Sequence, residues 1–514
     1  MLIMRKILFL FLFCCACAVR GTGAPAKDFA VRGFHIDFRA EVMTLDAMKA
    51  FAAELSGMGI NTIVMEWEAT FPFDKNAVIC NEYAFTPAEV ADFVAYCSGL
   101  GIDVIPLQHC FGHVEYILRH DRYAHLREHY RSELSQICPL HPQTEEAFRS
   151  IFTEVAAAHP SKYFHIGGDE TFLLGMCPKC SKYAAEHGKG KLFVEYIRKM
   201  CDIVHSLGKR PVLWADIITK HPEAIGLLPK DAVLVDWNYG WDIRHFGDID
   251  RIYDSGLEIW GAPAIRSSPD NYYLTSWLTH FNNQKVFIPY AREAGYRGMV
   301  MTSWSTSGLY GFFFEPKNEV TAMDPVRTVY PMAGFRILIA QYGEALKSAD
   351  PVDPKAFVTN YAQERFGLTA PEGEELWEIL TATQAVVTRG KDKAGNSVTA
   401  IRNQTGKLRD RLYAMNPLRN REEFEHFRLM FDIRMQYLAF KNIESICNSS
   451  RFNRAMAPEL LGRLRTEVMA FTPDLDRRFT ELHKGYLKDG EIGYLNAVRV
   501  RKIDQLCHKL EALK

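Results

Sequence analysis

The chain has 514 residues, 48% of them hydrophobic, and its 61 lysines and arginines nearly balance 62 aspartates and glutamates, for a formal net charge of −1. This length predicts a large core and more than one domain. The charge balance gives no electrostatic reason to expect nucleic acid or an anionic membrane surface as a partner. We therefore expect an ordinary globular protein that does not bind nucleic acid.

Residues 1–24 are predicted to be a secretory signal peptide. The basic pair Arg5 and Lys6 precedes the apolar run 7–13, and the small residues 16–18 fit a cleavage site. The apolar run is too short to span a bilayer. We expect export to a bacterial-type periplasm or to the cell surface. Three cysteines within this segment leave a lipid-anchored form open as an alternative.

From residue 31 onward, short β-rich runs alternate with helical patterns. The predicted strands are 31–38, 61–67, 103–108, 163–167, 211–215, 232–237, 257–261 and 298–304. Helical patterns between them include 45–57, 87–99, 144–159 and 192–207. Eight such alternations predict an α/β fold, a (β/α)8 TIM barrel, over residues 28–345. A doubly wound open sheet is the competing interpretation, but no glycine-rich phosphate turn follows the first strand.

After about residue 325 the strand pattern stops. The predicted helices are 324–342, which would close the barrel, and then 355–366, 374–389, 422–446, 458–469 and 474–513. We expect residues 346–514 to form an α-helical C-terminal domain that packs on the barrel. It would lend a loop to the site or provide the face of a homodimer.

Polar and aromatic residues stand at the C-terminal ends of seven of the eight predicted strands. They are His35, Asp37, Arg39, Glu66, Glu68, His109, His113, Asp169, Glu170, Trp214, Asp216, Asp236, Trp237, Tyr239 and Trp304. In a TIM barrel these ends meet at one face, where active sites lie. Carboxylate pairs among tryptophans, in a chain of near-neutral charge, indicate carbohydrate hydrolysis.

The stretch Gly167-Gly168-Asp169-Glu170 follows the β-rich run 163–166. Adjacent carboxylates repel each other and glycines weaken a strand, so packing does not explain this stretch, whereas close approach of a ligand does. Two neighbouring carboxylates cannot easily reach a sugar ring from opposite sides. We expect one of them to act on the leaving group and the other on a neighbouring substituent.

The run from His165 to Glu170, HIGGDE, resembles the H-x-G-G-D-E signature of glycoside hydrolase family 20, the β-N-acetylhexosaminidases. Segments 64–73, 104–120, 123–128 and 165–175 resemble the hexosaminidase D branch of that family, and the resemblance covers about residues 31–325. It implies an exo-acting enzyme that cleaves terminal β-linked GlcNAc or GalNAc from glycans, with retention and without a cofactor. The alternatives are a family 20 hydrolase that releases a disaccharide and a carbohydrate-binding protein without turnover.

The resemblance also implies roles for individual residues. Glu170 would be the general acid/base, and Asp169 would hold the substrate's 2-acetamido group while its carbonyl oxygen attacks the anomeric carbon, forming an oxazolinium. His113 would link the catalytic glutamate to Glu68, with Glu66 as the alternative partner. A core histidine is the alternative for His113. The residues expected to bind the sugar are Arg39, Asp37, Trp214, Asp216, Trp237, Tyr239 and Trp304.

Cys177 and Cys180 form a C-x-x-C pair just beyond the acidic motif. A lone C-x-x-C is a weak metal signal, because a structural zinc site needs four ligands. Cys138 and nearby histidines would complete such a site. A local disulfide and two free thiols are the alternatives, and we expect no bound metal.

Overall fold

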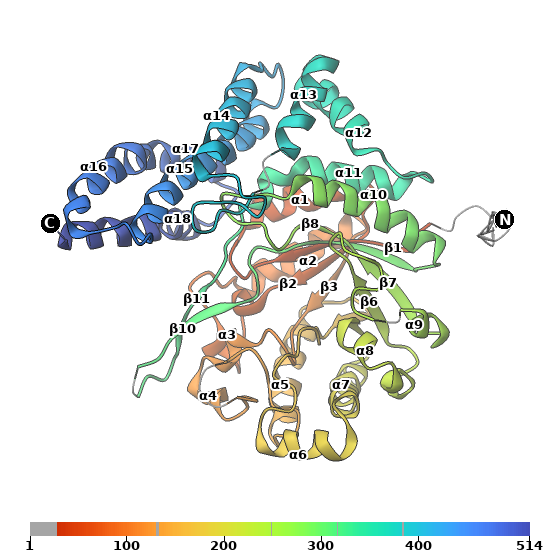
Figure 1. The fold of residues 1–514 in the computed structure, drawn as a ribbon. Helices are drawn as coiled ribbons and strands as arrows, with labels where there is room; N and C mark the ends of the chain where they lie inside the picture. Colours follow the sequence, from red (N-terminus) through yellow and green to blue (C-terminus); the bar gives the residue numbers. More distant parts are fainter. Residues whose placement is uncertain (1–27, 130–132, 248, 316, 383–384, 514) are drawn as a thin grey trace, which may run out of the picture.

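The computed structural model describes residues 28–129, 133–247, 249–315, 317–382 and 385–513. The predicted signal peptide, residues 1–24, lies outside these described residues. Figure 1 shows a barrel of strands wrapped by helices, with further helices extending to one side and ending at the C-terminus. Within the described ranges, no helix combines the length and apolar character needed to cross a membrane.

Eight parallel strands close into the barrel, as predicted (Figure 1). In pairing order they are β1 (Val31–Asp37), β2 (Thr62–Glu66), β3 (Asp103–Leu107), β4 (Tyr163–His165), β5 (Arg210–Trp214), β6 (Val233–Trp237), β7 (Glu258–Ala262) and β9 (Gly298–Ser303). β9 pairs back to β1, with Val31 opposite Gly298. A short further strand, β8 (Ala264–Arg266), pairs with the end of β9. The (β/α)8 prediction is confirmed.

The inside of the barrel is a packed apolar core rather than a channel. Alternate strand residues point inward and form one buried cluster: Val31, Val64, Ile105, Leu107, Tyr163, Val212, Trp214, Val233, Val235, Trp237, Trp260, Ala262 and Val300. Trp304 packs against this cluster where β9 ends. Large tryptophans thus close the barrel interior just below the face where polar residues gather.

The four helices predicted at 45–57, 87–99, 144–159 and 192–207 are present to within three residues at each end, together with further helices around the barrel. The helices around the barrel include α1 (Leu45–Gly57), α2 (Pro87–Gly99), α5 (Thr144–Ala157), α6 (Pro178–His187), α7 (Lys189–Ser206), α8 (Asp216–Lys220), α9 (Asp250–Asp254), α10 (Trp277–Glu293) and α11 (Arg336–Lys347), with the short α3 (Glu115–Leu118) and α4 (Asp121–Ala124) after β3. α2 begins with a capping box between Thr86 and Glu89, which satisfies free amide groups of its first turn.

The helix predicted over 324–342 is wrong in its first half. Residues Ala322–Pro325 form strand β11, which pairs antiparallel with β10 (Tyr310–Phe313), and helix α11 begins only at Arg336. Pro325 and Pro331 lack the amide hydrogen that a helix interior requires, so the chain cannot be helical through both. The hairpin β10–β11 stands away from the barrel (Figure 1).

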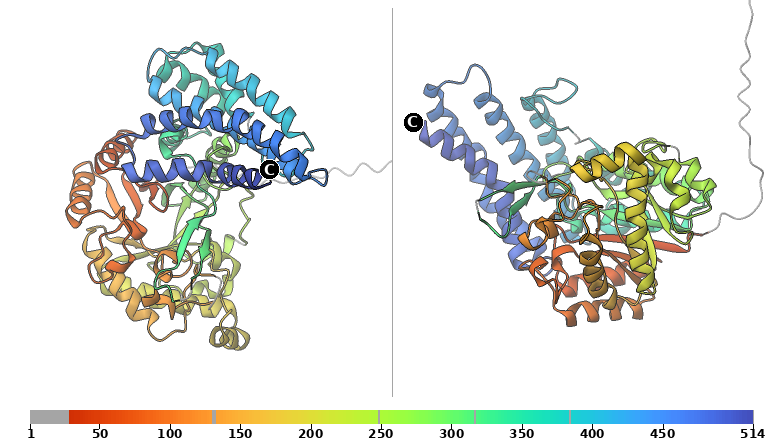
Figure 2. Two further views of the ribbon diagram at one scale, coloured as in Figure 1. Left: turned by 90° about the vertical axis from the view of Figure 1, so that its left-hand side faces the viewer. Right: turned by 90° about the horizontal axis from the view of Figure 1, so that it is seen from below.

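The C-terminal region is helical, and Figures 1 and 2 show its later helices extending from one side of the barrel. Its helices are α12 (Pro354–Tyr361), α13 (Ala370–Thr381), α14 (Val398–Ala414), α15 (Arg421–Cys447), α16 (Ala457–Glu467), α17 (Thr472–His483) and α18 (Asp489–Ala512). The single helix expected over 474–513 is two helices, because the chain turns at Gly485, whose φ is 78°. Helix α14 was not predicted.

The helical region and the barrel share one core. The long helix α15 contributes Phe427, which packs against Trp277 of α10, and His426, whose Nδ1 lies 2.8 Å from the hydroxyl of Tyr330. The two regions also belong to a single continuous cluster of buried apolar side chains. The barrel therefore carries the helical region as a packed layer.

Candidate active site

A cavity of about 450 Å³ lies at the C-terminal ends of the strands. Nine of the eleven residues predicted for catalysis or sugar binding line it: Arg39, His113, Asp169, Glu170, Trp214, Asp216, Trp237, Tyr239 and Trp304. The other two, Asp37 and Glu68, do not line it. The strand ends therefore meet in one pocket, although not every polar residue at those ends faces it.

The turn after β4 places the two adjacent carboxylates differently. Gly167 has φ 70° and lies so close to the ring of His109 that a Cβ would collide with it, so only glycine fits there. Glu170 itself adopts φ 45°. The side chain of Asp169 is buried, whereas that of Glu170 is 32% exposed at the cavity. The strained turn thus separates a deep carboxylate from an accessible one.

His113 bridges these two carboxylates. Its Nε2 lies 3.3 Å from Asp169 Oδ2 and 3.2 Å from Glu170 Oε2. Burial by itself raises the pKa of Asp169, but the charge and hydrogen bond of His113, with the charge of His109, outweigh it and lower that pKa to about 2. Burial alone would lower the pKa of His113, yet Asp169 and Glu170 hold it well above its usual range. Asp169 is therefore an ionised carboxylate beside an imidazolium.

The expected pair between His113 and Glu68 is not formed. His113 uses Nε2 for the two carboxylates, and its Nδ1 has no hydrogen-bond partner among the described residues. Glu68 Oε1 lies instead 3.7 Å from Arg39 Nε. The physical reason is that Glu68, two residues beyond the end of β2, pairs with the positive charge of Arg39, while the two carboxylates after β4 take the Nε2 of His113.

His109 provides the connection into the barrel. Its Nδ1 lies 3.6 Å from Asp169 Oδ1, and its Nε2 lies 3.1 Å from Glu66 Oε1. The second oxygen of Glu66 lies 2.9 Å from His35 Nε2. The sequence predicts His109 and Glu66 at strand ends but indicates no role for His109. The spacing of His109 and His113 after one strand is the signal that could have suggested a shared task.

Arg39 is held by three carboxylates. Its Nε lies 3.2 Å from Asp37 Oδ1 and 3.1 Å from Glu66 Oε1, in addition to the contact with Glu68. Its guanidinium carbon lies 4.8 Å from the ring centre of Trp304. Asp37 also accepts hydrogen bonds from the amide and hydroxyl of Ser305, both at 2.8 Å. Asp37 was expected to bind sugar, but its oxygens are occupied in holding Arg39 and the end of β9.

Aromatic rings form the walls of the cavity. Trp304 donates its indole N–H to the hydroxyl of Tyr239 at 2.8 Å, and Trp237 packs against Tyr239 with ring centres 5.0 Å apart. The ring of Trp214 packs against His165 in a tilted arrangement, with ring centres 4.5 Å apart. Lining residues that sequence analysis did not name include Phe172, Lys220, Trp241, His245, Phe246 and Arg327. The aromatic spacing from Trp237 to Trp241 is the signal that was missed.

Asp216 supports the catalytic turn from β5. Its Oδ2 accepts the backbone N–H of Glu170 at 3.2 Å, and its Oδ1 has no partner among the described residues. Burial, together with the negative charge of Asp169, raises the pKa of Asp216 to about 7, against the opposing charge of Lys220. The cavity thus contains two aspartates whose pKa values are pushed in opposite directions.

The C-terminal helical region does not reach this cavity in the described part of the chain. The lining residues run from Arg39 to Arg327, all within the barrel and its loops. The expectation that the helical region lends a loop to the site is therefore wrong. The physical reason is that its contacts with the barrel include those along α10 and α11, at the loop around Tyr330, at residues 42–44 after β1 and at Asp324 of β11, none of which lines the cavity.

The geometry agrees with comparisons to known proteins. The profile of the glycosyl hydrolase family 20 catalytic domain matches residues 32–306. Hexosaminidase D of Bos taurus is 25% identical over 294 residues, which cover 53% of this chain and 84% of that protein. Hexosaminidase D of Homo sapiens is 24% identical over 313 residues, covering 56% and 63%.

Among solved structures, the β-N-acetylhexosaminidase from Bacteroides fragilis NCTC 9343 superposes with a TM-score of 0.50 at 17% identity, covering 65% of this chain and 70% of that one. At this identity the likeness shows the fold alone. The family match, however, spans more than half of the chain and includes the acidic motif after β4. This chain therefore belongs to glycosyl hydrolase family 20, the β-hexosaminidase family of glycoside hydrolases.

Proposed function

We propose that this protein is an exo-acting β-N-acetylhexosaminidase that removes terminal β-linked GlcNAc or GalNAc with retention of configuration, using the substrate's own acetamido group as nucleophile. One observation carries the proposal: Asp169 and Glu170 enter the same cavity at different depths, and one histidine contacts both. An ordinary pair of catalytic carboxylates would approach the ring from two sides.

Asp169 suits the task of holding the acetamido group. It is buried and ionised, and its Oδ1 has no hydrogen-bond partner in the described structure. A buried oxygen without a partner is costly, so a substrate N–H that donates to it is strongly favoured. The bound N–H would orient the acetamido carbonyl oxygen toward the anomeric carbon. That oxygen forms a bond to the carbon while the glycosidic oxygen leaves.

Glu170 suits the task of the acid and base. Its side chain is the more exposed of the two, which places it toward the opening where the leaving group lies. It would protonate the departing oxygen and then take a proton from the water that opens the oxazolinium. His113 would fix the positions of both carboxylates relative to each other, because its Nε2 contacts an oxygen of each.

The walls provide recognition of the sugar. Burial raises the pKa of Tyr239, so its hydroxyl stays protonated and available as a donor to the acetamido oxygen. Arg39 lines the cavity and is fixed by buried carboxylates, which suits it to bind sugar hydroxyls. Trp214 and Trp237 would pack on the apolar faces of the ring and of its acetyl methyl group.

The experiment is a comparison of sugars that differ only at the 2-position. The enzyme should hydrolyse nitrophenyl β-GlcNAc or β-GalNAc, and should reject the matched β-glucoside or β-galactoside by ~10⁴-fold or more in kcat/KM, because these leave Asp169 unpaired and lack the nucleophile. A thiazoline mimic of the oxazolinium should inhibit. A stable covalent adduct of a 2-fluoro sugar on Asp169, found by intact mass and peptide mapping, would overturn the mechanism.

We also propose that the protein is exported, on the sequence of residues 1–24 alone. Expression in a Gram-negative host should yield a periplasmic or surface-bound form whose N-terminus begins after residue 18 or near residue 24. Retention of Met1 on cytoplasmic enzyme would contradict this proposal.

A further inference from the structure

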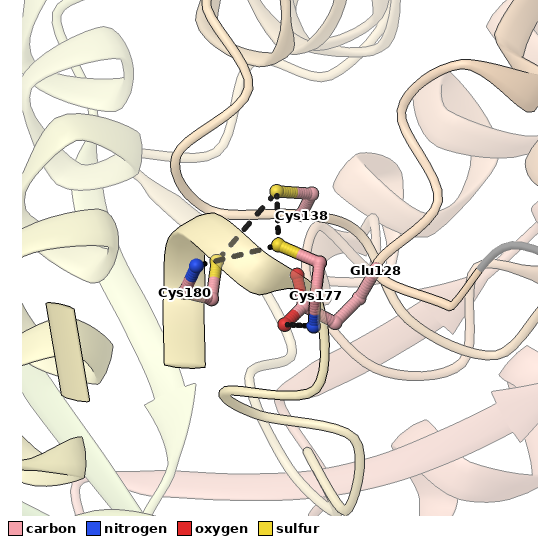
Figure 3. Close-up of side chains that lie close together, drawn as sticks. All are labelled: Glu128, Cys138, Cys177 and Cys180. Carbon is pink, nitrogen blue, oxygen red and sulfur yellow. Dashed lines mark hydrogen bonds between the residues drawn. The ribbon is translucent and has the colours of Figure 1, made fainter. Parts of the chain in front are cut away.

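Four side chains that could hold a metal ion converge beside the catalytic loop, outside the cavity (Figure 3). They are Glu128, Cys138, Cys177 and Cys180, and their ligand atoms all lie within 4.8 Å of one another. None of the four lines the cavity. The mechanism proposed above therefore uses none of them.

These residues come from two separate segments. Arg127 and Ile137 form an antiparallel bridge, and the amide of Glu128 donates to the carbonyl of Gln136 at 3.0 Å, so Glu128 and Cys138 emerge side by side. Cys177 is the N-cap residue of α6, and Cys180 lies in the first turn of that helix. The fold thus brings a C-x-x-C pair against a third cysteine 39 positions earlier in the chain.

The spacing of the sulfur atoms is that of thiolates around a tetrahedral ion. Cys138 Sγ lies 3.7 Å from Cys177 Sγ and 3.6 Å from Cys180 Sγ. Zn–S bonds of about 2.3 Å at tetrahedral angles put two sulfurs about 3.8 Å apart. A disulfide would use only two of these three thiols and leave the third without a function.

Glu128 completes the set. Its side chain is 1% exposed, and its Oε1 accepts the amide N–H of Cys177 at 3.0 Å. Its Oε2 has no hydrogen-bond partner among the described residues. Figure 3 shows this carboxylate lying next to Cys177, with the three sulfurs turned toward one another. A buried carboxylate oxygen without a partner is unfavourable, and a metal ion would satisfy it.

We propose that Cys138, Cys177, Cys180 and Glu128 bind one structural Zn²⁺ ion. Four protein ligands, three of them buried and Cys177 partly buried, describe a closed site, without the open position that a catalytic zinc needs. On binding, the thiols release their protons to solvent. The expectation from sequence was no metal, with Cys138 and nearby histidines as the candidates for further ligands; the geometry brings in Cys138 but supplies a glutamate in place of a histidine.

The ion would act as a clamp on the catalytic loop. Residues 171–176 connect Glu170 to Cys177, and within them the amide of Leu173 donates to Gln136 Oε1 at 2.8 Å. Phe172 on this loop is 69% exposed and lines the cavity. Fixing Cys177 to Cys138 ties the loop after β4 to the loop after β3, so the clamp would position Phe172 at the mouth.

The test is the metal content of the full-length protein, grown in zinc-supplemented medium and dialysed. Elemental analysis should find about one zinc per chain. A Cys138→Ser, Cys180→Ser double variant should contain at least ~10-fold less zinc per chain than the wild type. The matched control, Cys447→Ser with Cys507→Ser, removes two buried cysteines of the helical region and should keep the full zinc content. Zinc retained in the first variant would overturn the proposal.

Two measurements avoid dependence on variants that fold poorly. Wild-type protein loaded with Co²⁺ should show a thiolate-to-cobalt charge-transfer band and the visible bands of a tetrahedral site. A mercurial that reacts with the thiols should release the zinc, which a colorimetric indicator in the solution then detects. Wild-type protein with far less than one zinc per chain, and with no cobalt spectrum, would refute the site.

The role of Glu128 has a test of its own. Glu128→Gln should weaken zinc retention against a chelator, and unchanged retention would remove Glu128 from the ligand set.

Discussion

The cavity at the barrel mouth and the cysteine cluster beside it share the loops after β3 and β4, although the cavity is also lined from the ends of other strands, and they have opposite characters. At the mouth, buried carboxylates are balanced by fixed histidine and arginine side chains and open onto a cavity of about 450 Å³. In the cluster, three sulfurs and one carboxylate lie close to one another, and none of the four residues lines that cavity.

The difference lies in the surroundings of the unpaired polar atoms. At the mouth, Asp169 Oδ1, Asp216 Oδ1 and the indole nitrogen of Trp237 have no hydrogen-bond partner within the described structure, and they belong to residues that line a cavity open to a sugar. In the cluster, the unpartnered oxygen of Glu128 faces a closed set of ligand atoms. Polar groups that line an open cavity suit a substrate that binds and dissociates, whereas ligand atoms that enclose a small site suit a permanently bound ion.

The largest effect should come from the exposed carboxylate. Glu170→Gln keeps the shape of the side chain but removes the proton donor, so kcat on substrates with poor leaving groups should fall by ~10²–10⁴-fold. Nitrophenyl glycosides leave without protonation and should lose less in the first step. Zinc content should be unchanged. Equal losses for both classes of substrate would show that Glu170 is not the acid.

The next effect concerns the deep carboxylate. Asp169→Asn keeps the volume but removes the charge that orients and polarises the acetamido group, so kcat should fall by ~10²–10³-fold. KM should change much less, because the interaction strengthens in the transition state. Steady-state kinetics on β-GlcNAc measure both constants. A change in KM alone would indicate simple ground-state binding by Asp169.

A smaller effect should come from the wall of the cavity. Trp241 packs against Trp237 and Tyr239, with ring centres 5.6 Å and 5.2 Å away. Trp241→Ala should raise KM roughly tenfold, the equivalent of about 1.4 kcal/mol of lost contact, while kcat changes little. Trp241→Phe keeps an aromatic surface and should restore most of the affinity. If both variants bind substrate as well as wild type, Trp241 does not contact the sugar.

The smallest effect is a change in how stability depends on pH. The pKa of Asp216 is about 7 in the fold, raised from an ordinary value of 3.8. The fold therefore holds this proton more tightly than the unfolded chain. Its stabilising contribution is fully present below about pH 4 and is lost as the pH rises through about 7.

Asp216→Asn removes this titration, so the Tm should fall less than that of wild type between pH 4 and 7, by a few degrees at most. Scanning calorimetry at several pH values measures the slope of Tm against pH. Asp410→Asn, at a carboxylate that is 77% exposed, is the matched control and should follow wild type. Identical slopes for wild type and Asp216→Asn would mean that Asp216 is not protonated in the fold near neutral pH.

The sequence by itself determined the architecture and pointed to the candidate catalytic pair. Alternation of β-rich and helical runs is a local property, so all eight barrel strands could be located from it, and adjacent Asp169 and Glu170 could be recognised as functional because neither packing nor strand formation explains them. The bounds of helices are predicted less accurately where prolines interrupt the pattern. Residues 324–342 read as a helix, although Pro325 and Pro331 delay α11 to Arg336.

Only the tertiary structure decided which side chains meet. His113 contacts Asp169 and Glu170 rather than Glu68, and Asp37 holds Arg39 instead of facing the cavity. Cys138 reaches Cys177 and Cys180, with Glu128 rather than a histidine beside them. The physical reason is that local periodicity sets where a strand ends, whereas the partner of a side chain depends on backbone angles and loop paths that bring distant segments within a few ångströms.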